Sequence, residues 1–153
     1  PRDAAQFNTP SGRAGFSLHD LPHLEPQHGG THIMMTLRSH DQYNTTIYGL
    51  ADRYRGVKGN RRVVFMNASE MAERGWKTGH RVDLLSHWTD GERRSEGWLL
   101  IPYAIPRGNL ASYFPEANVL IPLDSTAAVS NTPTSKWIEI SFVGSQAADD
   151  GEE

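Results

Sequence analysis

The chain has 153 residues, 37% hydrophobic and 22% charged, which fits one globular domain with a single core and excludes general disorder. Its formal net charge of −3 argues against binding to a nucleic-acid backbone, and the absence of cysteine excludes disulfides, thiolate metal sites and thiol nucleophiles. The sequence contains neither an apolar run of about 18 residues nor a signal-peptide pattern. We therefore expect a cytoplasmic protein, and the first residue, Pro1, is what we expect of an excised or processed fragment.

The two ends of the chain are expected to lie outside the folded domain. Residues 1–30 combine several prolines and glycines with little hydrophobic periodicity, which is typical of an extended linker or arm. Residues 144–153 finish with four acidic side chains and one glycine, which predicts an acidic disordered tail. The folded domain is then expected to span residues 31–143.

Short β-rich runs recur between these ends and predict a mainly β domain, either a compact barrel or a sandwich. The expected strands are residues 33–37, 45–48, 62–66, 81–88, 93–103 and 136–143. Asp90 and Gly91, between two of these runs, predict a tight antiparallel hairpin. One short helix is indicated by Asn67 as its N-cap, Glu70 as the partner in a capping box and Gly75 as a left-handed end.

The first candidate binding segment is the polar stretch of residues 36–46, directly after an expected strand. Arg38, Ser39 and Thr45 suit phosphate oxygens. The Asp41 carboxylate can accept the adjacent N–H groups of a guanine or pterin ring. An ordinary polar turn between two strands explains the same composition equally well.

Two further segments carry polar and aromatic side chains. In the long connection expected over residues 106–118, Tyr113 and Phe114 can form a flat apolar wall, and Asn118 can donate and accept at a base edge. In residues 130–136, Lys136 precedes the last expected strand and can reach a phosphate or a ring carbonyl. Each segment alone also fits a solvated loop, so a binding site is indicated only if the three segments converge.

The order and spacing of these segments resemble a known family. The matching segments are Thr36-Leu37-Arg38 leading into Asn44-Thr45, residues 67–79, Tyr113-Phe114-Pro115-Glu116-Ala117-Asn118, and Ser130-Asn131-Thr132-Pro133. Over residues 33–142 the chain resembles the C-terminal molybdopterin-dinucleotide-binding domain of formate-dehydrogenase-like molybdopterin oxidoreductases, in the DMSO reductase superfamily. The resemblance implies a double-psi β-barrel of the aspartate-decarboxylase-like type with one or more short helices.

The resemblance also implies a cofactor, bis(molybdopterin guanine dinucleotide), carrying molybdenum or tungsten. This domain would orient the cofactor, while the N-terminal and central domains of the same parent chain hold the metal. We therefore expect neither catalytic residues nor metal ligands here, and we expect the isolated domain to lack the cofactor.

Candidate cofactor-binding residues follow from the resemblance and from the chemistry of the three segments. By position, Arg38, Gln42 and Asn44 correspond to the family's first cofactor loop, Asn118 to a residue near a guanine, and Lys136 to a basic residue before the last strand. The full set is Thr36, Arg38, Ser39, His40, Asp41, Gln42, Asn44, Thr45, Tyr113, Phe114, Asn118 and Lys136.

Other functions are weighed against this one. A stand-alone barrel module that binds a nucleotide or a protein partner is the main alternative, and the length of the parent gene product separates the two. A zinc site at His19, His23, His28 and His32 is disfavoured because nearby prolines and glycines argue against a helix that would align them. The basic run of residues 52–62 is expected either in a solvated loop or against the missing domains.

Two enzyme classes are disfavoured by position. Self-cleaving decarboxylases with the same barrel need a Gly-Ser bond at a turn, and Gly144-Ser145 falls in the expected tail, outside the barrel. Ser39-His40-Asp41 cannot form a local hydrolase triad, because neighbouring strand residues point to opposite faces.

Overall fold

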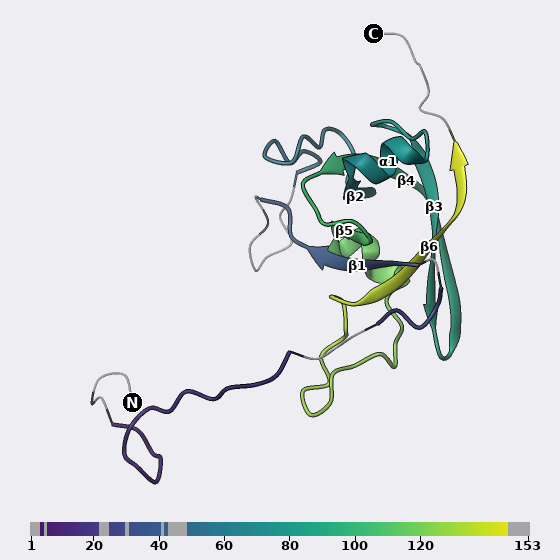
Figure 1. The fold of residues 1–153 in the computed structure, drawn as a ribbon. Coiled ribbons are helices and arrows are strands. Elements are labelled where there is room, and N and C mark those ends of the chain that lie inside the picture. Colours follow the sequence, from purple (N-terminus) through teal and green to yellow (C-terminus); the bar gives the residue numbers. More distant parts are fainter. Residues whose placement is uncertain are drawn as a thin grey trace.

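The computed structural model describes residues 4, 6–21, 25–29, 31–40, 42 and 49–146. The described residues form six strands that close into a barrel (Figure 1). The strands are β1 (His32–Leu37), β2 (Val63–Asn67), β3 (Arg81–Trp88), β4 (Gly91–Tyr103), β5 (Asn109–Tyr113) and β6 (Ile138–Gln146). The helical segments are α1 (Ala68–Glu73), α2 (Phe114–Ala117) and the 3-10 turn η1 (Asn118–Leu120).

The strands follow one another around the barrel in the order β1-β5-β2-β4-β3-β6, and β6 pairs back onto β1. The pairs β1–β5 and β2–β4 are parallel, whereas β1–β6, β2–β5, β3–β4 and β3–β6 are antiparallel. Closure removes the unpaired edges that an open sheet would expose. The prediction of a mainly β barrel of the double-psi type with short helices is confirmed.

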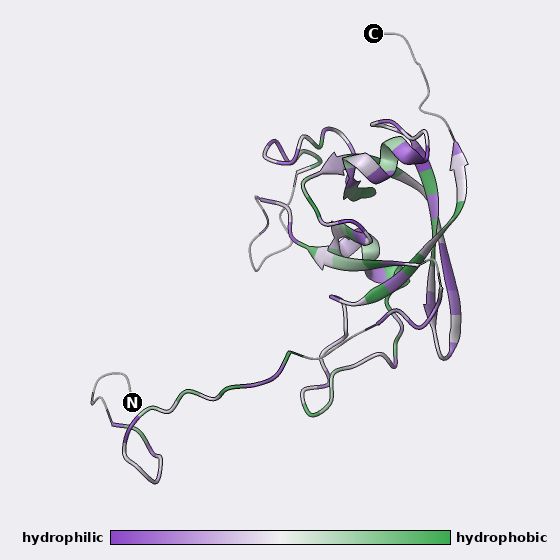
Figure 2. Cartoon of the chain, viewed as in Figure 1, coloured by the Kyte–Doolittle hydropathy of each residue, from purple (hydrophilic) through white to green (hydrophobic). Residues whose placement is uncertain are grey.

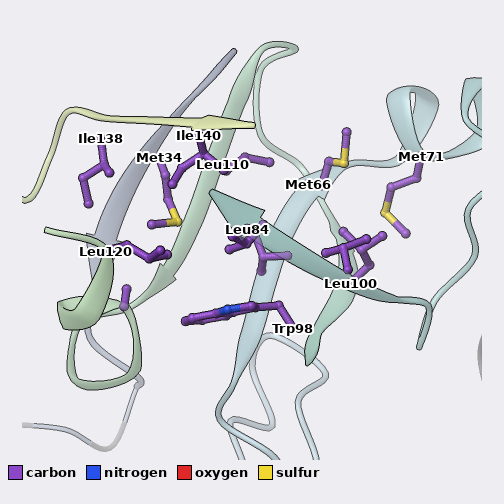
Figure 3. Packing of buried hydrophobic residues seen from close by; sticks show 13 residues of the cluster. Met34, Met66, Met71, Leu84, Trp98, Leu100, Leu110, Leu120, Ile138 and Ile140 are labelled. Carbon is purple, nitrogen blue, oxygen red and sulfur yellow. The ribbon is translucent and has the colours of Figure 1, made fainter. Parts of the chain in front are cut away.

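The core fills the barrel because side chains alternate between the two faces of each strand. Hydrophilic and hydrophobic residues accordingly alternate along the strands in Figure 2. Met66 and Trp98 belong to the larger buried cluster (Figure 3), whereas Phe65, next to Met66 on β2, belongs to a second cluster with Tyr113. Burial at about 25 cal/mol per Å² of apolar surface makes these clusters the main stabilising contribution.

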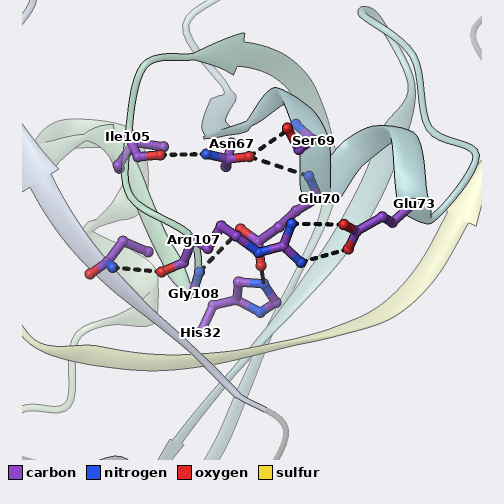
Figure 4. A network of polar contacts seen from close by, with 9 residues as sticks. His32, Asn67, Ser69, Glu70, Glu73, Ile105, Arg107 and Gly108 are labelled. Carbon is purple, nitrogen blue, oxygen red and sulfur yellow. Dashed lines mark hydrogen bonds and ion pairs between the residues drawn. The ribbon is translucent and has the colours of Figure 1, made fainter.

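The predicted helix is present as α1. Asn67 Oδ1 accepts the backbone N–H groups of Ser69 (2.9 Å) and Glu70 (3.3 Å), and Gly75 follows the helix at φ +70°. Of the predicted capping box, the bond from the Glu70 N–H to the Asn67 side chain forms, whereas the Glu70 carboxylate accepts the Gly108 N–H at 3.1 Å (Figure 4). Glu70 therefore ties the helix to the chain just before β5 rather than closing its own first turn.

Two segments differ from the expected elements. The long connection expected over residues 106–118 contains β5 and α2, because β5 is paired with β1 on one side and with β2 on the other. β6 extends to Gln146, so the expectation that Gly144 and Ser145 lie outside the barrel was wrong. Both residues pair with β3, where a backbone ladder needs no apolar side chains. The strand expected at residues 45–48 lies outside the described residues.

The expected N-terminal arm precedes this barrel. Within residues 6–21 and 25–29 the structure has no helix or strand. This arm contacts the barrel at Glu139, whose carboxylate accepts the N–H groups of Gln27 (2.9 Å) and His28 (3.0 Å). Across the described part of the chain, every helix is too short to traverse a membrane. The expected domain limit at residue 30 stays a prediction, whereas β6 continues past the limit expected at residue 143.

Candidate functional site

A pocket of about 310 Å³ lies at the end of the barrel where β1 and β5 finish, and this volume is in the range of small-ligand sites. Its lining comes from three stretches that are far apart in the sequence. These stretches supply Thr36, Leu37 and Arg38; Phe114, Asn118 and Ile121; and Thr132, Pro133, Ser135 and Lys136. The parallel register of β1 and β5 explains the meeting, because it places Leu37 beside Tyr113, the residue just before α2. The three segments singled out in the sequence therefore contribute to one hollow.

The lining has an apolar part and a polar part. Leu37, Phe114, Ile121 and Pro133 supply the apolar part, and the Phe114 side chain is 38% exposed. Among the polar residues, Arg38, Asn118 and Lys136 are exposed. Two cations and an amide beside an aromatic ring suit an anionic ligand that also carries a ring.

Backbone contacts fix the first and third stretches against each other. The Thr36 N–H donates to the Ser135 carbonyl at 2.9 Å, and the Lys136 Nζ donates to the Thr36 carbonyl. Residues 132–136 are therefore joined to the end of β1 rather than held apart from it. Lys136 thus presents its charge to the pocket from a fixed position at the rim.

The structure divides the predicted binding residues between the pocket and the interior beside it. Thr36, Arg38, Phe114, Asn118 and Lys136 line the pocket. Asp41, Asn44 and Thr45 lie outside the described residues. The remaining four are absent from the described lining, and each has another contact. These four are Ser39, His40, Gln42 and Tyr113.

Tyr113 is fully buried, although the sequence suggested it as half of an aromatic wall with Phe114. Its hydroxyl donates to Asp52 Oδ2 at 2.9 Å, and burial, with the hydrogen bond and charge of Asp52, raises the pKa of this hydroxyl. Tyr113 ends β5 on the core side, whereas Phe114 begins α2 and turns toward the pocket. The aromatic wall is therefore formed by Phe114 without Tyr113.

Asp52 lies beneath the first polar loop and is 1% exposed. Its Oδ2 accepts Arg55 Nη1 at 2.6 Å and the His40 backbone N–H at 3.2 Å, in addition to the Tyr113 hydroxyl. Burial raises the pKa of Asp52, but the hydrogen bonds from Arg55 and Tyr113 outweigh this effect, so the pKa lies below its ordinary value. His40 is thereby used in loop structure, and its ring packs on Tyr54 at a centroid distance of 3.7 Å.

Two residues that shape the site fall outside the three segments singled out in the sequence. Ile121 lines the pocket, and no feature of its apolar neighbourhood marks it as a lining residue. Arg61 is 4% exposed and bonds Ser39 and Gln42, although the basic run that contains it was expected to be solvated or docked on other domains. Arg61 lies two residues before β2, with the exposed Arg62 between them, so the basic run itself offers no signal that separates Arg61 from its exposed neighbours Arg53 and Lys58.

The N-terminal histidines take separate positions. His19 is exposed, His28 bonds Glu139 through Nδ1 at 2.8 Å, and His32 is buried at the start of β1, while His23 lies outside the described residues. Among the residues that the structure describes, no group of three or more histidine, cysteine or acidic side chains is placed to hold a metal ion.

Fold and site together define a small closed β-barrel domain with a ligand-sized pocket formed by three stretches at one end. No family model matches the chain. It is 55% identical over 143 residues to proteins named uncharacterized oxidoreductase in Mycobacterium tuberculosis and Mycobacterium bovis, a match that covers 90% of this chain. It is 42% identical over 140 residues, or 88% of this chain, to protein YdeP of Escherichia coli. The chain spans only 18% of the length of each of these relatives, so it corresponds to one domain-sized part of much longer proteins.

Proposed function

We propose that this chain is the cofactor-binding domain of a molybdopterin-dependent, formate-dehydrogenase-like oxidoreductase, in which it orients bis(molybdopterin guanine dinucleotide). The observation that carries the proposal is the meeting of three separated polar segments at one pocket. The relatives named as oxidoreductases support the broader class, because this chain matches one part of each of them. We further propose that the other domains of the same polypeptide are its partners and that the protein is cytoplasmic.

The side chains of the pocket fit one end of such a dinucleotide. Arg38 and Lys136 provide positive charge for phosphate or ring carbonyl oxygens. Phe114 offers a face for a planar ring, and the Asn118 amide can pair with the edge of a guanine. The hydroxyls of Thr132 and Ser135 add neutral hydrogen-bonding groups at the rim.

The size of the pocket limits what this domain can hold by itself. A volume of about 310 Å³ suits a portion the size of a single nucleotide, not two complete dinucleotides. The remaining surface of the cofactor must therefore contact other domains, and the relatives are long enough to contain them. The metal and pterin would supply the redox chemistry when bound, whereas the residues of this chain would bind and orient the cofactor.

A stand-alone binding module is the second candidate function. The observation that favours it is that the pocket volume of about 310 Å³ already suits a single nucleotide. In that case the ligand is a free nucleotide or a segment of a partner protein. Identification of the ligand that copurifies with the complete polypeptide separates the two functions.

The test uses the complete polypeptide that contains this chain. Bound cofactor is released, identified by mass spectrometry and expressed per mole of protein, with molybdenum and tungsten measured on the same sample. We expect the pterin guanine dinucleotide in the unmodified protein. We expect lower occupancy in Arg38→Ala, Asn118→Ala and Lys136→Ala, with the barrel still folded. Lys77→Ala is the matched control, because Lys77 is exposed and does not line the pocket.

Two results would contradict the proposal. Full occupancy in all three pocket variants would remove this pocket from the cofactor site. A guanine nucleotide recovered without pterin or metal would favour the stand-alone module instead.

A further inference from the structure

Arg61 has a guanidinium group that is enclosed beside the pocket, with the residue only 4% exposed. Its Nε donates to Glu116 Oε1 at 2.9 Å, and its Nη1 donates to Ser39 Oγ at 3.1 Å. Its Nη2 donates to Gln42 Oε1 at 3.5 Å, and its guanidinium carbon lies 4.5 Å from the centroid of the Tyr113 ring. A charge at this depth is tolerated because it is paired and hydrogen-bonded on several sides.

The partners of Arg61 belong to two different walls of the pocket. Ser39 directly follows Arg38, which lines the first wall. Glu116 lies on α2 midway between Phe114 and Asn118, which line the second wall. One planar guanidinium therefore holds both walls through different nitrogen atoms, a geometry that a lysine ammonium cannot reproduce.

We propose that Arg61 is a positioning residue that sets the distance and angle between the wall at residues 36–39 and the wall at residues 114–118. It does so without lining the pocket itself. The third wall, at residues 132–136, is held independently by the bonds that Thr36 makes with Ser135 and Lys136. The absence of Arg61 therefore loosens the first two walls relative to each other and leaves the third in place.

Backbone amides report on each wall separately in hydrogen exchange. The Gln42 N–H donates to the Ser39 carbonyl at 3.1 Å, and the Ile121 N–H donates to the Asn118 carbonyl at 3.1 Å. The Trp137 N–H, which donates to the Thr134 carbonyl at 3.2 Å, reports on the third wall. Hydrogen exchange is measured on the complete polypeptide, unmodified and carrying either Arg61→Met or Arg61→Lys. Arg61→Lys is the milder substitution and serves if Arg61→Met does not fold.

Arg62→Met is the matched control for both substitutions. Arg62 is the next residue along the chain, but its side chain lies over Trp98 at 5.5 Å and donates to Ser95 Oγ at 3.4 Å, away from both walls. We expect exchange at Gln42 and Ile121 to rise at least about tenfold in both Arg61 variants and to stay within about twofold in Arg62→Met, the scale expected when a buried support is lost. Exchange at Trp137 stays unchanged in all of them.

A second measurement rests on the proposed function, since it follows the occupancy of the pterin guanine dinucleotide in the same variants. We expect about a tenfold loss of affinity in Arg61→Met, no recovery in Arg61→Lys, and an unchanged affinity in Arg62→Met. If the unmodified polypeptide binds no such dinucleotide, the proposed function fails, but the exchange measurement still decides the role of Arg61. Unchanged exchange at Gln42 and Ile121, or an equal rise at Trp137, would overturn the positioning role whatever the ligand is.

Discussion

Asn67 and Asn118 lie at opposite ends of the barrel and use the same side chain in different ways. The Asn67 side-chain amide has all its partners within the protein, because its Oδ1 caps α1 and its Nδ2 donates to the Ile105 carbonyl at 2.8 Å (Figure 4). Asn118 is exposed at the end of α2, and its side chain lines the pocket. The two ends thus contain similar residue types with different partners.

The same contrast holds for the charged groups at the two ends. Around α1, Arg107 forms two hydrogen bonds with Glu73, and Glu70 accepts the Gly108 N–H, so these groups have their partners within the protein. Around the pocket, Arg38 and Lys136 are exposed and line a hollow, and Lys136 does so while also donating to the Thr36 carbonyl. A polar group whose partners lie inside the protein mainly contributes stability, whereas one that lines a hollow can contribute affinity.

The buried carboxylate beneath the pocket provides the largest expected effect. Asp52→Ala removes the acceptor of the Tyr113 hydroxyl and of Arg55, and both donors are left without it. Loss of one partner from a buried charged network typically costs about 3 kcal/mol of unfolding free energy, which we expect urea titration to detect. This result would show that the pocket end also depends on internal polar contacts, one layer below its rim.

Asp90→Ala is the control for that substitution. Asp90 also binds an arginine, Arg93, but this pair lies at the exposed β3–β4 turn. We expect a much smaller loss than for Asp52→Ala, as is usual for surface ion pairs. Equal losses at the two positions would mean that burial of Asp52 does not matter.

The next largest effect is expected at Asn67. Asn67→Ala removes the hydrogen-bond acceptor of two N–H groups in the first helical turn and the donor to the Ile105 carbonyl. Loss of a cap of this kind lowers the unfolding free energy by about 1.5 kcal/mol. Thermal unfolding should show the loss, and cofactor occupancy at the other end should not change. A drop in cofactor occupancy larger than the loss of stability explains would mean that the two ends of the barrel are energetically coupled, contrary to our expectation.

The sequence was sufficient for parts whose signals are local. The turn at Asp90-Gly91, the cap at Asn67 and the alternation of most strands each depend on a few neighbouring residues, and each is present. β5 was missed because it holds small and polar residues, Ala111 and Ser112, that are buried only through pairing with β1 and β2. Such strand pairing depends on the whole barrel, so the five residues of β5 carry little sequence signal for a strand.

The pocket was predictable to the same extent. The polar composition of three segments identified its three walls, but not which side chain of each segment would turn inward. Ser39 and Gln42 are directed to Arg61 instead, and this contact depends on a residue about twenty positions away in the sequence. The choice between Tyr113 and Phe114 was decided by the point at which β5 gives way to α2, a boundary that their aromatic character alone does not reveal.

A smaller effect, visible only as pH falls, is expected from His32 at the α1 end. Burial lowers the pKa of His32, although Glu70 at 3.4 Å acts in the opposite direction. Below the ordinary histidine pKa of about 6.5, His32 binds a proton in the unfolded chain but stays neutral in the folded chain. As the pH is lowered through this range, the unfolding free energy therefore decreases by at most about 1.4 kcal/mol per pH unit. Above that pH the contribution vanishes, since His32 is neutral in both states.

His32→Gln tests this dependence, because glutamine keeps a polar side chain without a proton to gain. Unfolding free energies are compared between pH 7 and pH 5 for both proteins. The substituted protein should lose less stability over this interval. Parallel curves would exclude His32 as a source of acid sensitivity.

The smallest expected change in stability belongs to Asn118, and it completes the comparison with Asn67. Asn118→Ala keeps the backbone carbonyl that accepts the Ile121 N–H, and it removes only an exposed side chain, so the unfolding free energy should change by less than about 0.5 kcal/mol. Cofactor occupancy of the complete polypeptide should nevertheless fall, because the lost amide lines the pocket. The same Asn→Ala substitution would then reduce stability alone at one end of the barrel and binding alone at the other. A loss of stability for Asn118→Ala as large as that for Asn67→Ala would instead mean that the Asn118 amide is also hydrogen-bonded within the protein. The contrast between the two ends of the barrel would then fail.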